Sequence, residues 1–140
     1  MTNFKDLLID ILDEKQKTLK DLENANILGK KSFYNFDSFS PYLSTVIKIA
    51  NYLEVSLDYL SGNTTENNFK KYKEDQNNFY NNIINLMKAL NISHVKLSKD
   101  LEISRPNFSY WKKGTLPKFS TLLELSNYLD CSIDDFLDFE

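Results

Sequence analysis

Apolar residues recur along the chain at the three- and four-residue spacing of amphipathic helices. Two segments show this pattern clearly, at residues 4–14 and 79–91. Their apolar faces consist of Phe4, Leu8, Ile11 and Leu12 in the first segment, and of Phe79, Ile83, Leu86, Met87 and Leu90 in the second. Helix breakers are scarce, because the 140 residues include only three Gly and three Pro. The pattern therefore predicts an all-α protein.

The chain also contains an internal repeat. The first four apolar residues of the second segment repeat those of the first at a constant offset of 75 residues. Further along, NYLEVSLDYL (51–60) matches NYLDCSIDDF (127–136) at an offset of 76 residues, as Pro41 matches Pro117. A fixed internal period indicates repeated structural units. We therefore expect two copies of one five-helix unit, with one residue gained in the second copy between its third and fourth helices.

This repeat divides the chain into a first domain at residues 1–62, a polar linker at 63–78 and a second domain at 79–140. The linker has no sustained apolar period, although its Phe69 and Tyr72 are able to dock on either domain. In the first domain we expect helices at about residues 4–14, 18–26, 29–36, 43–53 and 56–61.

Residues 93–114 read as two short helices joined by a tight turn. Ser93 and Ser104 are suited to cap the first and the second helix. Pro106 falls in the first turn of the second helix, where a missing N–H costs nothing, and Gly114 is suited to end that helix.

The faces of these two helices differ in polarity. The residues expected to point inward are Leu97, Leu101, Ile103, Phe108 and Trp111, and those expected to point outward from the second helix are Arg105, Asn107, Ser109 and Lys112. A polar, basic face on the second helix of such a pair fits the major groove of DNA.

The run LSKDLEISRPNFSYWKKG, followed by PKFSTLLELSNYLDCSIDDFL, resembles the helix-turn-helix domain of phage Cro and repressor proteins, the Xre-like class. The resemblance covers residues 79–139 and departs from the family at Glu102, where a small residue is usual, and at Lys112, where an acid is usual. It implies an all-α fold of two tandem five-helix lambda-repressor-like helix-turn-helix domains. The copy at residues 4–61 is degenerate, because it resembles the family clearly only in its last two helices.

Charge is segregated along the chain, although the net charge is −3. Residues 88–118 carry seven cations and two acids, a balance of 7 − 2 = +5, whereas residues 119–140 carry six acids and no base. In the first copy, residues 13–31 hold five lysines and four acids, a balance of +1. Positive charge thus gathers around the second helix pair, as phosphate binding requires.

We expect three side chains to contact bases. Arg105 is suited to a bidentate contact with guanine O6 and N7, or else to a phosphate contact. Asn107 is suited to pair with adenine or to face solvent. Tyr110 is placed to reach a thymine methyl group or a phosphate, or to pack on the neighbouring helix.

A second group is suited to contact phosphates. The N-terminus of the first helix of the pair offers free amide groups near Ser93, which favours an anion. The expected phosphate contacts are Ser93, His94, Lys99, Lys112, Lys113 and Lys118. The matching region of the first copy predicts a weak second reader consisting of Lys30, Lys31, Ser32 and Asn35.

Other classes of function find no support in the residues. No nucleophile has a neighbouring base, and there is no glycine-rich phosphate loop or suitably placed carboxylate pair, so we expect no enzyme activity. His94 is the only histidine and lacks partners at ligand spacing, so we expect no metal and no cofactor. The absence of a long apolar run and the single Cys131 predict a cytoplasmic protein that does not enter a membrane.

We therefore expect a sequence-specific binder of double-stranded DNA that regulates or represses transcription by occupying an operator. Each copy offers one reading helix, so a single chain is able to present two, as a dimer of single-unit repressors does, with half-sites about 34 Å apart. The degenerate first copy favours instead a homodimer that uses the first copy or the paired last helices, with the second copies reading DNA. The alternative is a protein-interaction module, an antirepressor or phage-type inhibitor, which has lost DNA binding and binds a partner protein through its acidic faces. The net charge favours this alternative, and the charge segregation favours DNA.

Overall fold

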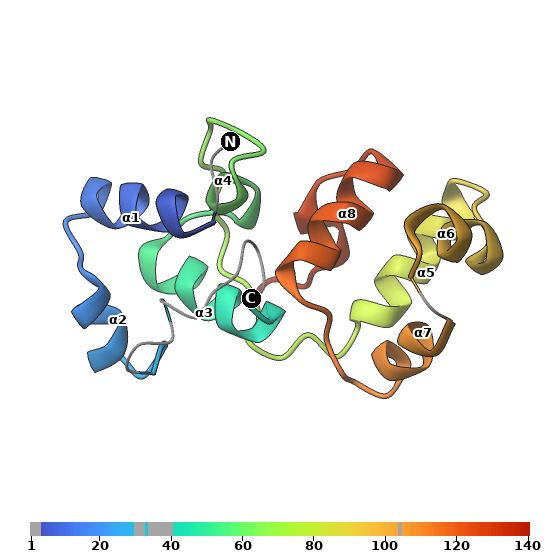
Figure 1. The fold of residues 1–140 in the computed structure, drawn as a ribbon, viewed down its shortest axis with the longest axis horizontal. Helices are drawn as coiled ribbons and strands as arrows, with labels where there is room; N and C mark the ends of the chain where they lie inside the picture. Colours follow the sequence, from blue (N-terminus) through green and yellow to red (C-terminus); the bar gives the residue numbers. More distant parts are fainter. Residues whose placement is uncertain (1–3, 30–32, 34–40, 104) are drawn as a thin grey trace.

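A computed structural model describes residues 4–29, 33, 41–103 and 105–140, with only the backbone at position 105 (Figure 1). Within these residues the chain forms eight α-helices and one 3-10 helix, and no strand is present beyond two isolated bridges. The predicted all-α class is therefore confirmed. None of the helices in this part of the chain is long and apolar enough to cross a membrane.

The helices divide into a first half and a second half, which lie on the two sides of the molecule (Figure 1). The first half consists of α1 (Phe4–Glu14), α2 (Leu19–Asn24), α3 (Leu43–Leu53) and α4 (Leu57–Ser61). The second half consists of α5 (Phe79–Ala89), α6 (His94–Leu101), α7 (Arg105–Lys112), α8 (Phe119–Leu129) and the 3-10 helix η2 (Ile133–Phe136).

Side-chain caps decide where several helices begin. The Thr18 hydroxyl accepts a hydrogen bond from the Asp21 amide (3.2 Å), and the Asp21 carboxylate accepts one from the Thr18 amide (2.8 Å). Ser93 caps α6 in the same way, because its hydroxyl accepts from the Lys96 amide (3.1 Å). The Ser93 cap was predicted from the sequence.

Two expectations about the helices need correction. The helix predicted at 18–26 is shorter, because Thr18 is its cap and Asn26 has a left-handed conformation (φ 60°). The last element of the second half is a 3-10 helix, not an α-helix. Most of the helix predicted at 29–36 lies outside the described residues, as does the predicted cap Ser104.

Left-handed residues end equivalent helices in both halves. Gln16 and Asn91 (both φ 58°) follow α1 and α5, and Glu54 (φ 56°) and Asp130 (φ 51°) cap α3 and α8. Such residues allow the chain to leave a helix abruptly. The two halves thus share turn geometry at these positions.

The turns after α2 and α6 differ between the halves. In the second half, the left-handed Glu102 (φ 56°) directly precedes the buried Ile103. In the first half, one residue separates the left-handed Asn26 from the buried Leu28. The first half has therefore diverged at the entry to the segment that corresponds to α7.

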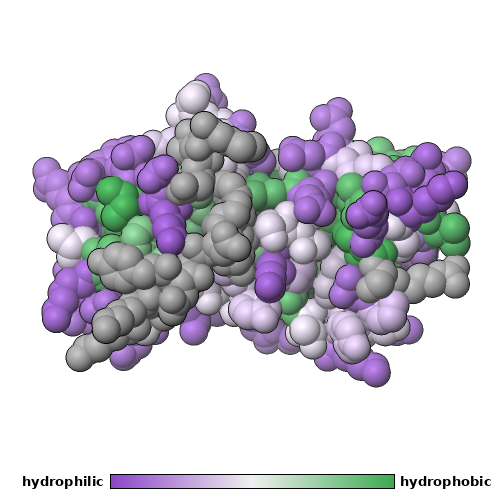
Figure 2. Space-filling model, in the orientation of Figure 1, coloured by the Kyte–Doolittle hydropathy of each residue, from purple (hydrophilic) through white to green (hydrophobic). Residues whose placement is uncertain are grey.

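The buried apolar side chains form one cluster that extends through both halves. The starts of α3 and α8 lie near its centre (Figure 1). Phe4 of α1 contacts Phe119 of α8 edge-to-face, with ring centroids 5.9 Å apart. Hydrophilic residues cover much of the face in Figure 2, with apolar residues visible between them. The halves therefore share a single core.

Backbone hydrogen bonds join the starts of α3 and α8. The Leu43 amide donates to the Pro117 carbonyl (3.1 Å), and the Phe119 amide donates to the Pro41 carbonyl (2.8 Å). Between these bonds, Tyr42 and Lys118 form an antiparallel bridge. These bonds satisfy the first amide of each helix, which has no partner within its own helix.

The short helices α4 and η2 also contact each other. The Asp58 carboxylate accepts a hydrogen bond from the Ile133 amide (3.2 Å). The Leu57 amide donates to the Tyr72 hydroxyl (2.8 Å), which in turn donates to the Asp134 carboxylate (2.5 Å). Tyr72 thus links the N-terminus of α4 to η2.

The segment at 63–78, expected as a polar linker, is held between the halves. Tyr72 is fully buried, and its backbone exchanges two hydrogen bonds with the Asn51 side chain of α3 (both 3.0 Å). Gln76 is also buried and bonds the Asp138 backbone twice (2.9 and 2.8 Å). The expectation that Tyr72 docks is therefore confirmed, and Tyr72 docks on both halves.

These contacts concern one expectation about assembly. We expected the paired last helices as one candidate contact between two chains, and the homodimer stays a prediction. Within one chain, α4 and η2 contact each other. Their N-terminal groups already have partners there.

The Asp58 and Asp134 carboxyl groups are half-buried, and burial raises the pKa of each above its ordinary value of 3.8. Hydrogen bonds from Ile133 to Asp58 and from Tyr72 to Asp134 oppose this rise in pKa without cancelling it. Burial also raises the pKa of Tyr72, so its hydroxyl stays protonated and able to donate.

We predict that Tyr72→Phe lowers the free energy of unfolding by about 2 kcal/mol, because the buried Leu57 amide loses its acceptor and Asp134 loses its donor. Denaturant titration measures this change. Tyr52→Phe serves as the control, because the Tyr52 ring is also partly buried, while its hydroxyl makes no hydrogen bond within the part of the chain that the structure describes. Equal losses in both variants would contradict a special role for the Tyr72 hydroxyl.

We also predict a pH dependence that distinguishes the buried carboxyl groups. Because their pKa is raised in the folded protein, their favourable contribution is complete below pH 3.8 and is lost as the pH rises through the folded pKa. The double variant Asp58→Asn/Asp134→Asn should therefore gain most, relative to the parent, near pH 7 and least near pH 4. Unfolding measured at both pH values tests this, and an unchanged difference would contradict it.

Candidate nucleic-acid interface

α6 and α7 form the helix pair that the sequence predicted. Leu97 is the buried residue of α6, and Ile103 is buried in the turn. Phe108 and Trp111 anchor α7, with ring centroids 5.0 Å apart, and Trp111 contacts Phe79 of α5 edge-to-face at 5.7 Å. Trp111 is therefore a core residue, as expected, and cannot act as a stacking platform for bases.

The outward face of α7 follows from this anchoring. At about 100° per residue, Pro106, Ser109 and Tyr110 lie opposite Phe108 and Trp111. All three are exposed, and Tyr110 is 53% exposed. Because large apolar rings usually avoid water, Tyr110 is the prominent feature of this face.

The three residues expected to contact bases differ in their position on α7 and in their exposure. Tyr110 occupies the middle of the exposed face. Asn107 lies on the flank of α7 and is half-buried, so it does not point fully outward as expected. The Arg105 side chain lies outside the described part of the chain, so its expected contact stays a prediction. Ser109, which was not among the expected contacts, is more exposed than Asn107.

Two hollows flank α7 and bring candidate residues together. A hollow of about 350 Å³ is lined by Tyr80, His94, Phe108, Ser109 and Lys112. On the other flank, a hollow of about 490 Å³ includes Asn107, Tyr110 and Lys118 in its wall. The expected phosphate contacts therefore lie on both sides of α7.

Four expected phosphate contacts are exposed lysines: Lys99, Lys112, Lys113 and Lys118. None of them forms a salt bridge within the described part of the chain. Lys96, in contrast, pairs with Asp100 at 3.5 Å. The four lysines place ammonium groups around α7, although the hollow that holds Lys118 is also lined by Glu102 and Glu124.

A hydrogen bond from α8 engages the carboxylate of Asp100 in α6. The Tyr128 hydroxyl donates to the Asp100 carboxylate (2.5 Å), and this bond, more than the nearby lysines, lowers the pKa of Asp100. Asp100 thus stays ionised but engaged by Tyr128 and Lys96. Sequence reasoning missed Tyr128, because nothing in the local pattern of α8 indicates a partner 28 residues away.

The remaining candidates fall into two groups. Ser93 and His94 are exposed at the start of α6, and the His94 ring lies 4.7 Å from the Phe108 ring, centroid to centroid. No group of three metal-ligating side chains occurs among the described residues. The expected second reader, Lys30, Lys31, Ser32 and Asn35, lies outside the described residues.

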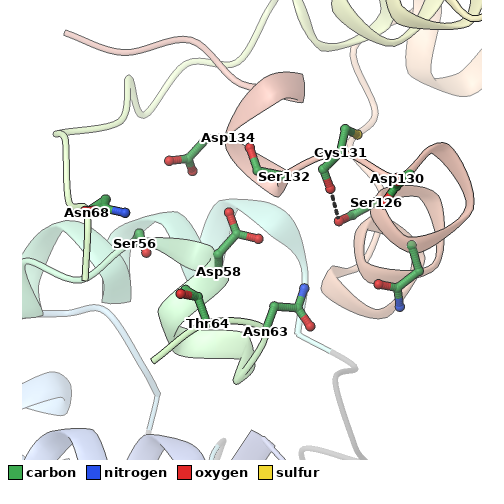
Figure 3. Close-up of a pocket in the computed structure, with 11 residues that line it drawn as sticks. Ser56, Asp58, Asn63, Thr64, Asn68, Ser126, Asp130, Cys131, Ser132 and Asp134 are labelled. Carbon is green, nitrogen blue, oxygen red and sulfur yellow. Dashed lines mark hydrogen bonds between the residues drawn. The ribbon is translucent and has the colours of Figure 1, made fainter. Parts of the chain in front are cut away.

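A polar pocket of about 520 Å³ lies at the junction of the halves, near α4, η2 and the end of α8 (Figure 3). Its wall includes Asp58, Asp130 and Asp134, and Ser126 donates a hydrogen bond to the Cys131 carbonyl there (2.7 Å). Burial is the main reason that the pKa of the Cys131 thiol is raised to about 11, so the thiol is protonated at neutral pH. The carboxylates of Asp58 and Asp134 already accept hydrogen bonds between the halves.

Comparison with known families matches residues 82–140 to the Cro/C1-type HTH DNA-binding domain. The match includes α6, the turn and α7, and continues through α8 and η2. It supports a helix-turn-helix domain of this type in the second half, and it indicates DNA binding. No curated protein and no solved structure matches the chain.

We predict that Glu102→Gly raises the free energy of unfolding by about 1 kcal/mol, because glycine adopts the left-handed conformation without the clash of a Cβ. Glu102 is exposed, so no packing is lost. Glu102→Gln is the control, because it removes the charge and keeps the Cβ. Denaturant unfolding measures both, and an equal gain in the glutamine variant would assign the effect to charge.

Proposed function

We propose that the protein binds double-stranded DNA in a sequence-specific way and regulates transcription in the cytoplasm by occupying an operator. In this proposal α7 enters the major groove and blocks access of polymerase or of another regulator. The supporting observation is the exposed face of α7, with lysines that lack an acidic partner on both sides of it in the described part of the chain.

The proposed roles follow from position. Tyr110 contacts a thymine methyl group or a phosphate from the exposed face of α7. Arg105 reads guanine at the start of α7, and Asn107 contacts adenine from the flank. The lysines on α6, α7 and the loop after α7 hold phosphates, assisted by Ser93 and His94 at the start of α6.

We further propose that the chain is a tandem pair of helix-turn-helix domains, at residues 1–62 and 79–140, joined by residues 63–78. Equivalent left-handed turns after α1 and α5 and after α3 and α8 support this proposal. The divergent turn after α2 supports a weaker role in DNA reading for Lys30, Lys31, Ser32 and Asn35.

The second candidate function is binding of a partner protein through acidic faces, without DNA. The net charge of −3 and the three carboxylates around the pocket between the halves favour it. The two functions make opposite predictions for duplex binding.

We predict that Lys112→Ala/Lys113→Ala weakens binding to selected and scrambled duplexes alike. Each phosphate contact adds about −0.9 to the slope of log affinity against log salt, so the slope should flatten by about 1.8. Affinities at two salt concentrations, on duplexes selected from random DNA, provide the measurement.

Arg105→Ala should behave differently, because a base contact acts only on the right sequence. We predict a loss of about 1–3 kcal/mol on the selected duplex and a much smaller loss on scrambled DNA. Lys30→Ala is the matched change in the first copy and should cost little on either duplex. Equal losses for both changes would mean that both copies read DNA, and a parent that binds no duplex would favour the protein-interaction function.

A further inference from the structure

The two halves contact each other through residues that are equivalent in the internal repeat. Leu43 donates to Pro117, and Phe119, which is equivalent to Leu43, donates to Pro41, which is equivalent to Pro117. The same pair of repeat positions therefore forms this hydrogen bond twice, once with the donor in the first half and once with the donor in the second half. Such reciprocity is the mark of an isologous contact, the kind that joins two subunits about a two-fold axis.

A second pair of contacts follows the same rule. Asp58 accepts from the Ile133 amide, and their equivalents are Asp134 and Leu57. The Leu57 amide reaches Asp134 through the Tyr72 hydroxyl. Asp58 thus bonds the amide of η2 directly, whereas Asp134 is joined to the amide of α4 through the Tyr72 hydroxyl.

This contact fills the place where a second subunit would bind. Its polar groups are satisfied within one chain, and the apolar cluster continues through it without a break. A partner chain would have to displace these bonds to use the same surface.

The first half also contributes to the surface beside α7. Tyr42, which precedes α3, lines the same hollow as Asn107, Tyr110 and Lys118. It is 58% exposed, and the Lys118 ammonium lies 5.9 Å from the centre of its ring. Tyr42 therefore positions a lysine that we expect to hold a phosphate.

We propose that one chain is a complete DNA-binding unit, in which the first half takes the place of a second subunit and supplies Tyr42 to the surface that contacts DNA. The proposal rests on the DNA-binding function proposed above. It predicts that the chain is a monomer, and a homodimer through the first half would contradict it.

Sedimentation velocity tests the pairing of the halves without DNA. We expect a monomer at tens of micromolar full-length protein, and a stable dimer would overturn the proposal. The same experiment with a selected duplex of about 25 base pairs, long enough for two half-sites one helical turn apart, should give one chain per duplex. Two chains per duplex would overturn it as well.

The matched variants Tyr42→Leu and Tyr52→Leu test the contribution of the first half to DNA binding. Both remove an aromatic ring next to a lysine, since Lys17 lies 5.6 Å from the Tyr52 ring, but Tyr52 lines a different hollow that does not include α7. We expect Tyr42→Leu to weaken duplex binding about 2- to 5-fold, the equivalent of one exposed cation–π pair, and Tyr52→Leu to leave it unchanged.

The outcomes separate the two proposals. Unchanged binding by Tyr42→Leu, with the parent binding normally, would overturn the role of Tyr42. Absence of binding by the parent to any duplex would overturn the DNA-binding function and the complete DNA-binding unit together. The state of the free protein would then still decide whether the first half replaces a second subunit.

Discussion

One buried hydroxyl group joins the two halves through hydrogen bonds, in addition to the core that they share. Tyr72 comes from a polar segment between the halves, yet its side chain is fully buried and its oxygen joins the Leu57 amide to the Asp134 carboxylate. A buried amide at a helix start and a buried carboxylate are each costly without a partner. The hydroxyl serves both, because it accepts from one and donates to the other. The hydroxyl therefore links α4 of the first half to η2 of the second half.

Much of the fold was predictable from periodicity and caps. The residues of α1 and α3 follow regular apolar spacing, and Thr18 and Ser93 stand where an N-cap is needed, so local pattern was sufficient. The role of Tyr72 was only partly predictable. Its aromatic ring in a polar run indicated docking, but its hydroxyl partner is 62 residues away, and no local pattern specifies such a contact. The partner of α4 and of η2 was not specified by local pattern for the same reason, because helical periodicity shows that a face is apolar and not what covers it.

The candidate site shows the same division between local and distant causes. Burial of Phe108 and Trp111 follows from their spacing of three residues, and that burial places Tyr110 on the exposed face. Asn107 was expected to point outward, but the hollow next to it is formed by the loop before α8 and by Tyr42 from the other half. A helical wheel of α7 alone contains neither the loop before α8 nor Tyr42. The engagement of Asp100 by Tyr128 was hidden in the same way, although this bond lowers the pKa of Asp100.

The asymmetry of the halves then has a physical explanation. A dimer of identical chains must keep both readers, because one sequence encodes both. In the proposed tandem pair one chain holds both copies, so this constraint is absent, and the first copy is free to change its turn after α2 and to lose basic charge while it still supplies its half of the contact. The contact residues of the first half, Pro41, Leu43 and Asp58, keep equivalent partners in the second half. Selection on the first half would thus act on its contact with the second half and on Tyr42 more than on a reading helix of its own. In the function proposed above, such a chain has one strong reader, so the specificity of DNA binding should depend on α7.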